Sequence, residues 1–318
     1  MTMSEEVKLY QVGTFAAGNR LLDPERRTVQ ARSGRSNSLT SGHRACQGCG
    51  EALGARYVLD AAMRATDGNL VAVNSTGCLE VFSTPYPESS WQLPWLHSLF
   101  GNGPAVAAGV AAALKAKGRD DLRVVGQAGD GGTVDIGFGC LSGMFERNDD
   151  VLYICYDNEA YMNTGVQRSS ATPFGAWTTT TPAKRPKQQQ KKDILRILAA
   201  HGIPYAATAT VAYPEDFLAK FARAREVRGT RFLHLLAPCP PGWKIPSERA
   251  IEYARLAVAT RVFPLVEIEN GRDWRVTVNP EVQPLEKYLE GQGRFRQLVG
   301  DAERLSLVTR AIDDRWNT

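Results

Sequence analysis

The chain carries a glycine-rich turn around an acidic residue, Gly129-Asp130-Gly131-Gly132, directly after a predicted strand, and Asn158 ends the next one. Glycines let a backbone approach phosphate oxygens, while a carboxylate and an amide oxygen can hold a hard cation between phosphates. Neighbouring parallel strands end at one sheet edge, where such folds bind ligands. A β-turn followed by a helix N-cap would explain the turn alone. The strand before it and the spacing to Asn158 favour a site for a metal-bound diphosphate.

Six cysteines offer a second kind of chemistry. Cys46 and Cys49 form a Cys-x-x-Cys pair, while Cys78 and Cys239 each follow a predicted strand. Glycine or proline neighbours place most of these in or beside loops, where thiolates can converge on a metal cluster. The pair alone fits half a zinc site or a redox pair equally well, and Cys239 alone fits an incidental buried thiol. The other two lie in a small-residue helix and an apolar strand and are assigned to packing: Cys140 and Cys155.

Alternating strands and helices must position these residues. Short apolar runs alternate with amphipathic or alanine-rich stretches along most of the chain. This alternation predicts an α/β fold with a parallel sheet covered by helices on both faces. Strands are expected at 70–73, 122–126, 151–156, 206–210, 231–236 and 264–268, and helices at 51–65, 104–117, 135–146, 192–201, 214–226 and 248–260.

The chain divides into three regions. Residues 1–40 are rich in Arg, Ser, Gly and Thr and predict an N-terminal arm that lies on another surface. Residues 41–245 form the main domain, and residues 246–318 an extension packed on that domain or on a partner. A Pro- and Trp-rich stretch at 84–95 predicts a loop, and the basic run at 184–192 a polar, exposed one.

Composition bounds the class of protein. With 318 residues, 43% of them apolar, the chain can bury a large core. Its net charge of +4 is too weak for a nucleic-acid partner. No run approaches the roughly 20 apolar residues that cross a bilayer, and residues 1–6 contain no apolar signal core. We therefore expect a cytoplasmic protein without nucleic-acid or membrane partners, and the few cysteines argue against a disulfide scaffold.

Five segments resemble, in the same order, the β subunit of pyruvate:ferredoxin oxidoreductases, a family that binds thiamine diphosphate. The resemblance runs from about residue 40 to about residue 270 and implies the diphosphate-binding type of thiamine fold. The segments are 42–53, 76–81, 95–97, 157–173 and 237–240.

The resemblance also implies roles for single residues. Asp130 and the Asn158 side chain would bind Mg²⁺, joined by the backbone carbonyl of Ala160. Thr164 would bind the diphosphate, and Asn163 would face the thiazolium ring and the substrate as the catalytic polar group. The remaining cofactor-binding residues are Gly77, Cys78, Gly129, Gly131 and Gly132, and the ligands of a 4Fe-4S cluster are Cys46, Cys49, Cys78 and Cys239.

The implied activity is the anaerobic, coenzyme A-dependent oxidative decarboxylation of a 2-oxoacid, with pyruvate the best candidate, to acyl-CoA and CO₂. Electrons would pass through the 4Fe-4S cluster to ferredoxin or an electron-transfer subunit. A glutamate of a pyrimidine-binding α-type subunit would activate the cofactor, so this chain would supply half of an active site in a hetero-oligomer.

Two alternatives stay open at this point. One is a non-oxidative thiamine-diphosphate decarboxylase or synthase whose cysteines bind structural zinc, which the iron and zinc content of the protein would distinguish. The other is an electron-transfer subunit without catalysis. The intact Gly129-Asp130-Gly131 turn and Asn158 argue against the second alternative.

Overall fold

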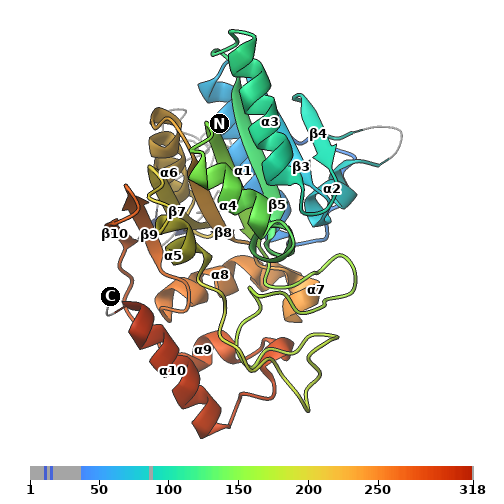
Figure 1. Ribbon diagram of the computed structural model, residues 1–318. Helices are drawn as coiled ribbons and strands as arrows, with labels where there is room; N and C mark the ends of the chain where they lie inside the picture. Colours follow the sequence, from blue (N-terminus) through green and yellow to red (C-terminus); the bar gives the residue numbers. More distant parts are fainter. Residues whose placement is uncertain (1–10, 13–14, 17–36, 86–88, 317–318) are drawn as a thin grey trace, which may run out of the picture.

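An eight-stranded sheet forms the centre of the computed structural model, which describes residues 11–12, 15–16, 37–85 and 89–316 (Figure 1). Most of the predicted N-terminal arm lies outside the described residues. The strand order is β10-β9-β7-β8-β6-β5-β3-β4. The strands are β3 (Leu70–Ser75), β4 (Trp95–Ser98), β5 (Arg123–Gly129), β6 (Val151–Asp157), β7 (Tyr205–Thr210), β8 (Arg231–Leu236), β9 (Leu265–Glu269) and β10 (Asp273–Val278), and a separate antiparallel pair is formed by β1 (Gln11–Val12) and β2 (Phe15–Ala16).

The sheet is parallel from β7 to β4, as predicted, and antiparallel at its other edge. β9 runs antiparallel to β7, and β10 antiparallel to β9. Two strands of this sheet were not predicted. β4 begins at the end of the Trp-rich stretch that we expected to be a loop, and β10 is largely exposed. Both lack the buried apolar run that marks a central parallel strand.

Helices flank the sheet on both sides (Figure 1). The segment between β5 and the next helix is a single π-helical turn, η1, which carries the glycine-rich motif. The helices and helical turns are α1 (Gly50–Ala65), α2 (Cys78–Ser83), α3 (Gly103–Ala116), η1 (Gly131–Asp135), α4 (Phe138–Glu146), α5 (Ile194–Ala199), α6 (Pro214–Glu226), α7 (Pro240–Trp243), η2 (Ser247–Arg249), α8 (Ala250–Ala259), α9 (Glu286–Leu289), η3 (Gly293–Phe295) and α10 (Ala302–Trp316).

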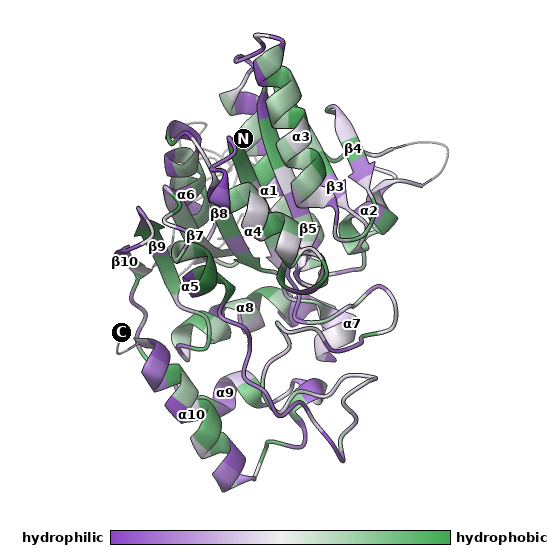
Figure 2. Cartoon of the chain, in the orientation of Figure 1, coloured by the Kyte–Doolittle hydropathy of each residue, from purple (hydrophilic) through white to green (hydrophobic). Residues whose placement is uncertain are grey.

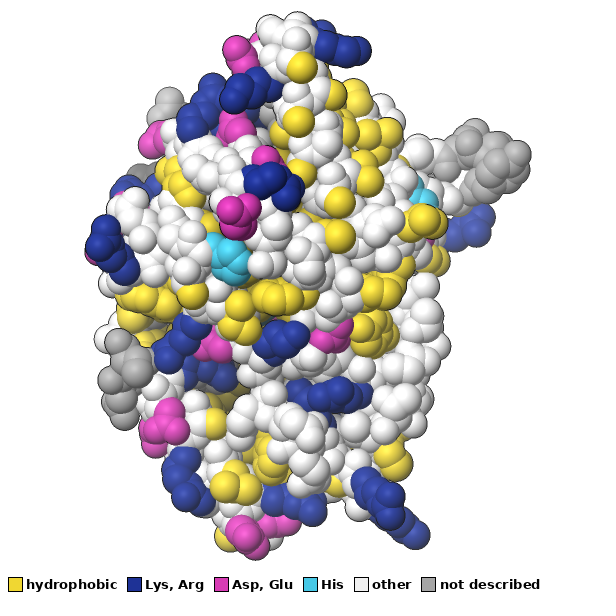
Figure 3. Space-filling view, viewed as in Figure 1, with side chains coloured by type: hydrophobic (Ala, Val, Ile, Leu, Met, Phe, Trp, Pro, Cys, Tyr) yellow, Lys and Arg dark blue, Asp and Glu magenta, His cyan; other side chains and the backbone are white. Residues whose placement is uncertain are grey.

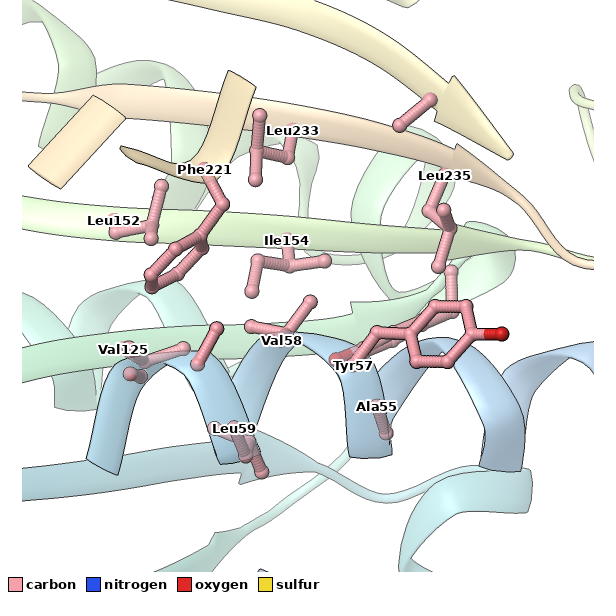
Figure 4. Packing of buried hydrophobic residues seen from close by; sticks show 14 of the residues in the cluster. Ala55, Tyr57, Val58, Leu59, Val125, Leu152, Ile154, Phe221, Leu233 and Leu235 are labelled. Carbon is pink, nitrogen blue, oxygen red and sulfur yellow. The ribbon is translucent and has the colours of Figure 1, made fainter. Parts of the chain in front are cut away.

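Two apolar clusters attach these helices to opposite faces of the sheet. On one face, Val58 of α1 and Phe221 of α6 pack with Ile154 and Leu233 of the central strands (Figure 4). Residues of α3, α4 and α5 pack on the other face, where Cys155 is fully buried. Successive strand residues face opposite sides. Both sides of the central strands are therefore buried, which is why these strands read as continuous apolar runs.

The C-terminal segment adds β9 and β10 to the sheet and forms a third apolar cluster below it. Trp243, Tyr253, Tyr288 and Phe295 are the large side chains of this cluster. Figure 2 shows α10 with both hydrophobic and hydrophilic residues, as expected for a helix that packs on one side. Among the described residues, no helix is both long and apolar enough to cross a membrane.

Close approach of α3 to the sheet depends on Gly126 in β5. A Cβ atom there would lie 2.6 Å from the Tyr153 ring and 3.2 Å from the Cβ of Ala107. We therefore expect Gly126→Ala to lower the free energy of unfolding by about 1–3 kcal/mol through overpacking. Gly109, on the exposed side of α3, has nothing within 4 Å of the corresponding position, and Gly109→Ala should stabilise by about 0.5–1 kcal/mol. Urea unfolding followed by circular dichroism measures both, and equal effects of the two changes would contradict the packing argument.

Candidate functional site

The glycine-rich turn and Asn158 meet at the carboxyl edge of the sheet. β5 and β6 are paired neighbours, with Gly129 opposite Tyr156, so Asp130 and Asn158 follow adjacent strand ends. Both side chains are buried. The turn is tightly packed, because a Cβ atom on Gly131 would lie 2.2 Å from the Tyr161 ring. The sequence therefore requires glycine where the loop after β6 crosses the turn.

One oxygen atom of each of these two side chains has no hydrogen-bond partner in the described part of the chain. These atoms are Oδ1 of Asp130 and Oδ1 of Asn158, and both are buried. The other oxygen of Asp130 accepts a hydrogen bond from Ser169 Oγ at 2.5 Å. Burial, with the nearby Asp157 carboxylate, raises the pKa of Asp130 well above its usual range. Burying an oxygen atom without a hydrogen-bond partner costs free energy. A hard cation bound between these two oxygens would remove that cost, and oxygen atoms are the ligands that such cations prefer.

The other residues of the predicted diphosphate site lie on the loop after β6 and at the end of β3. Ala160 is buried beside Asn158, whereas Asn163 and Thr164 are exposed. The Thr164 hydroxyl donates to Gln167 Oε1 at 2.6 Å, so in this structure its partner lies within its own loop. Gly77 leaves open space where a side chain would project, with the nearest atom 4.0 Å away.

Four cysteines line a single cavity of about 200 Å³ next to this site. Cys49 caps α1, Cys78 begins α2, and Cys239 immediately precedes α7. The Cys-x-x-Cys turn reaches Cys239 because Gly50 packs directly on Pro238, to whose carbonyl it donates at 2.9 Å. The cavity is lined by Cys46, Cys49, Cys78 and Cys239 together with Glu51, Asn158 and Asn163. Cys140 is not part of it.

Burial makes this cavity unfavourable for thiolates without added positive charge. It raises the pKa of Cys49 to about 12 and, less strongly, that of Cys239 to about 11, and the Glu51 carboxylate adds to both shifts. The pKa of Cys78 is raised for the same reasons. Metal ions reverse such shifts because they bind the deprotonated thiol. Within the described residues, no group of three or more His, Cys, Asp or Glu side chains is arranged to hold a metal ion.

Glu51 joins the two halves of the site and was not predicted. Its carboxylate, 2% exposed, accepts from Asn158 Nδ2 at 3.1 Å and from the backbone N–H of Leu79 at 3.2 Å. Burial raises its pKa to about 7 although both hydrogen bonds oppose the shift. The bond to Asn158 leaves the asparagine Oδ1 free to face a cation. The sequence did contain a signal for this residue. Glu51 is a charged residue directly after Cys-x-x-Cys-Gly, at the start of a helix that must pack on a sheet.

Buried ion pairs hold the backbone on either side of Asn158. Lys191 Nζ lies 2.5 Å from Asp157 Oδ2 and 2.7 Å from Glu159 Oε1. Asp157 also meets His234 at 2.7 Å, and Arg294 of η3 pairs with Glu159 at 2.6 Å. Burial opposes ionisation of Asp157, but the Lys191 ammonium and His234 together lower its pKa. These pairs therefore hold both flanking carboxylates in place and favour the ionised form of Asp157.

The prediction of a polar, exposed loop at 184–192 is wrong for part of the run, in which Pro186 and Lys187 are buried and Lys191 is largely so. Lys184 and Arg185 are exposed, but Lys187 is 2% exposed and the Lys191 side chain 13%. Composition indicated a solvated loop because lysine is rarely buried without a partner. Here the partners are carboxylates and backbone carbonyls from distant parts of the chain, which composition does not reveal.

The fold and the glycine-rich turn define a thiamine-diphosphate enzyme. A family model described as "Thiamine pyrophosphate enzyme, C-terminal TPP binding domain" matches residues 75–235, which include β5, η1, β6 and β7. The match covers the turn, Asn158 and Cys78, although Cys46, Cys49 and Cys239 lie outside it. The chain therefore has a thiamine-diphosphate-binding domain.

Similarity along most of the chain identifies the family within this class. The pyruvate synthase subunit PorB of Methanothermobacter thermautotrophicus is 53% identical over 82% of this chain and 90% of its own length. The ketoisovalerate oxidoreductase subunit VorB of Pyrococcus abyssi is 48% identical over 87% of this chain and 90% of its own. The chain belongs to this family of 2-oxoacid:ferredoxin oxidoreductase subunits, as the motifs predicted.

A solved structure shows the same fold at lower identity. It is described as 2-oxoglutarate:ferredoxin oxidoreductase from Magnetococcus marinus with 2-oxoglutarate, coenzyme A and succinyl-CoA bound. The superposition has a TM-score of 0.57 at 24% identity and covers 69% of this chain and 79% of that one. It supports the mostly parallel sheet with helices on both faces.

The position of Glu51 generates a stability prediction. Glu51→Ala removes the acceptor for two buried donors, so it should lower the free energy of unfolding by about 1–3 kcal/mol. Glu146→Ala, at an exposed position near the end of α4, is the matched control and should stay within about 0.5 kcal/mol of wild type. Urea titration measures both changes. A Glu51 variant as stable as the Glu146 variant would show that the buried bonds contribute nothing.

Proposed function

We propose that this chain, with partner subunits, catalyses the coenzyme A-dependent oxidative decarboxylation of a 2-oxoacid to acyl-CoA and CO₂. The observation that carries the proposal is that the diphosphate site and the four-cysteine cavity have residues in common. Asn158 and Glu51 border the four-cysteine cavity, and Asn158 also follows the strand next to the diphosphate turn. A cofactor that releases electrons and a cluster that accepts them would therefore be neighbours.

Residues of this chain would hold the magnesium diphosphate. Asp130 and Asn158 each offer a buried unpartnered oxygen, and the Ala160 carbonyl lies in the same loop. The glycines of the turn, with Gly77 and Thr164, would bind the cofactor around them. Bound thiamine diphosphate supplies the electron sink for decarboxylation.

Asn163 would act on the reacting groups, because it borders the cavity beside Asn158. A polar amide at that position can hydrogen-bond a substrate whose charge changes during the reaction. We assign catalysis by this chain to Asn163 and regard Asn158 as a metal ligand positioned by Glu51.

The four cysteines would hold a 4Fe-4S cluster. They line one cavity of about 200 Å³, and four cysteine thiolates are the usual ligand set of such a cluster. The relatives named as pyruvate synthase and ketoisovalerate oxidoreductase subunits favour such a cluster over the structural zinc of the non-oxidative alternative. Electrons would leave through the exposed side, where Cys46 lies at the surface, to ferredoxin or an electron-transfer subunit.

Exposed apolar side chains near the site support a partner subunit. Leu99 is 75% exposed and Ile136 60%. They lie close together, because Ile136 contacts the position where Gly101 would carry a Cβ atom, and Phe100 packs on Tyr161 at 5.9 Å. Apolar surface of this kind marks protein interfaces, and we propose that the pyrimidine-binding α-type subunit docks here and completes the cofactor site.

Pyruvate is the proposed substrate, and residues 41–245 the part that holds both cofactors. The 53% identical relative is a pyruvate synthase subunit, and the 48% identical one is named for ketoisovalerate.

Residues 246–318 brace the part of the chain at 41–245 through Arg294. Figure 3 shows Lys and Arg mixed with Asp and Glu over the visible face, which supports protein partners over nucleic acid. We place the complex in the cytoplasm.

The cluster assignment predicts a loss of iron in one cysteine variant. Cys239→Ser in the anaerobically purified complex should remove about four irons per copy of this chain, whereas Cys140→Ser should remove none. Iron analysis and electron paramagnetic resonance of the reduced complex measure the difference. Unchanged iron in the Cys239 variant, or zinc in place of iron, would favour the non-oxidative alternative.

The activity is tested on the anoxic complex with a panel of 2-oxoacids, coenzyme A and a viologen acceptor. We expect the highest kcat/KM with pyruvate and no acceptor reduction without coenzyme A. Asp130→Ala should lower kcat/KM by roughly 100-fold or more, since even outer-shell changes at metal sites cost 10–100-fold. Asp120→Ala, exposed in the turn before β5, should leave it unchanged. Higher efficiency with a branched oxoacid would replace pyruvate as the assignment.

A further inference from the structure

Lys187 is a buried ammonium whose partners are backbone carbonyls. Its side chain lies inside the long loop between β6 and α5. Nζ donates to the carbonyl oxygen of Ser170 at 3.1 Å, to that of Gln190 at 3.3 Å, and to that of Thr172. Among the described carboxylates, none forms an ion pair with it. Burying such a charge is costly, and burial together with Arg168 and Lys191 lowers its pKa to about 8. The hydrogen bonds of Lys187 to the loop carbonyls therefore offset the electrostatic cost of burying its charge.

Two of the three carbonyls that Lys187 holds, those of Ser170 and Thr172, belong to the segment 169–172, which reaches the predicted metal site. Ser169 Oγ donates to Asp130 Oδ2 at 2.5 Å. Thr172 Oγ1 donates to the Glu159 carbonyl at 2.7 Å and accepts from the backbone N–H of Ser169 at 3.0 Å. The segment thus fixes one oxygen of Asp130, and Oδ1 of the same carboxylate is the unpartnered atom.

Backbone hydrogen bonds also connect the loop around Lys187 to segment 169–172 and to the residues that follow it. The Lys192 N–H donates to the Ser170 carbonyl at 3.0 Å, and the Gly175 N–H donates to the Lys187 carbonyl at 2.8 Å. The Ser170 N–H in turn donates to Asp135 Oδ2 at 2.9 Å, next to the glycine-rich turn. The ammonium is therefore bonded at the centre of a loop whose strands of backbone it connects.

We propose that Lys187 is a positioning residue for the magnesium diphosphate site. Its ammonium fixes segment 169–172, and Ser169 then orients Asp130 so that Oδ1 faces the cation. The inference rests on the proposed function, since it assigns Asp130 to that cation. Lys187 differs from Lys191 in a way that makes it testable: replacing Lys187 leaves no buried carboxylate without its ion pair, whereas replacing Lys191 would.

The test is a calorimetric titration of the cofactor-stripped complex with thiamine diphosphate at fixed Mg²⁺. Lys187→Met should weaken binding roughly tenfold, as loss of groups behind a metal ligand does. The kcat at saturating cofactor and the KM for the oxoacid should change much less. Lys184→Met, an exposed lysine of the same loop, is the control and should bind as wild type does.

A double-mutant cycle with Ser169→Ala separates positioning from general stability. If Lys187 acts through Ser169, Lys187→Met should add little to the effect of Ser169→Ala, because residues in one network are coupled. A merely structural role would give independent, multiplicative losses. Should K187M fail to assemble, Lys187→Arg enters the same cycle, since it keeps the positive charge but changes the geometry of the hydrogen bonds to the three carbonyls.

The outcomes distinguish this inference from the proposed function. Wild-type affinity in K187M, or multiplicative losses in the cycle, would overturn the role of Lys187 while leaving the site assignment intact. A wild-type complex that binds no thiamine diphosphate in the presence of Mg²⁺ would overturn the proposed function and this inference with it.

Discussion

Negative charge buried at the carboxyl edge of β5 and β6 is the constraint on which this structure depends. Asp130, Asp157 and Glu159 are all buried there within three positions of a strand end. A buried carboxylate is tolerated only with a charged or hydrogen-bonded partner. Lys191 and Arg294 neutralise the two residues that flank Asn158, and Asp130 retains an oxygen without a partner. The two carboxylates that flank Asn158 are thus paired within the protein, whereas Asp130 keeps an oxygen that a cofactor-bound cation could bind.

The same constraint explains why the C-terminal segment belongs to the site. Arg294 lies 4.0 Å over the Trp243 ring while it pairs with Glu159. The Trp243 indole N–H donates to the Asn158 carbonyl at 2.9 Å. The loop that carries Asn158 is therefore held by side chains that come after β8. These contacts add to the packing of the buried loop residues Phe174 and Ala176 in the third apolar cluster.

Prediction succeeded where local pattern and tertiary burial agree. The bounds of α6 and β8 matched because α6 starts at Pro214 after a turn and β8 is a continuous apolar run buried on both faces. The helix expected from residue 135 begins three residues later, because the glycine-rich motif forms a π-helical turn instead. β10 was missed because an exposed edge strand shows no burial pattern, and its pairing with β9 supplies what its side chains do not.

The sequence by itself determined the order of strands and helices, the glycine-rich turn with its distant asparagine, and the family, because these depend on local spacing and on which residues follow each strand. Tertiary structure decided which charged residues are buried. Glu51 meets Asn158 across 107 positions of the chain, and Lys187 lies within a run that composition marks as solvated. The free energy that permits such burial comes from partners far away in sequence. Spacing therefore fixes where a cofactor can bind, and folding decides which side chains hold the cofactor-binding residues in place.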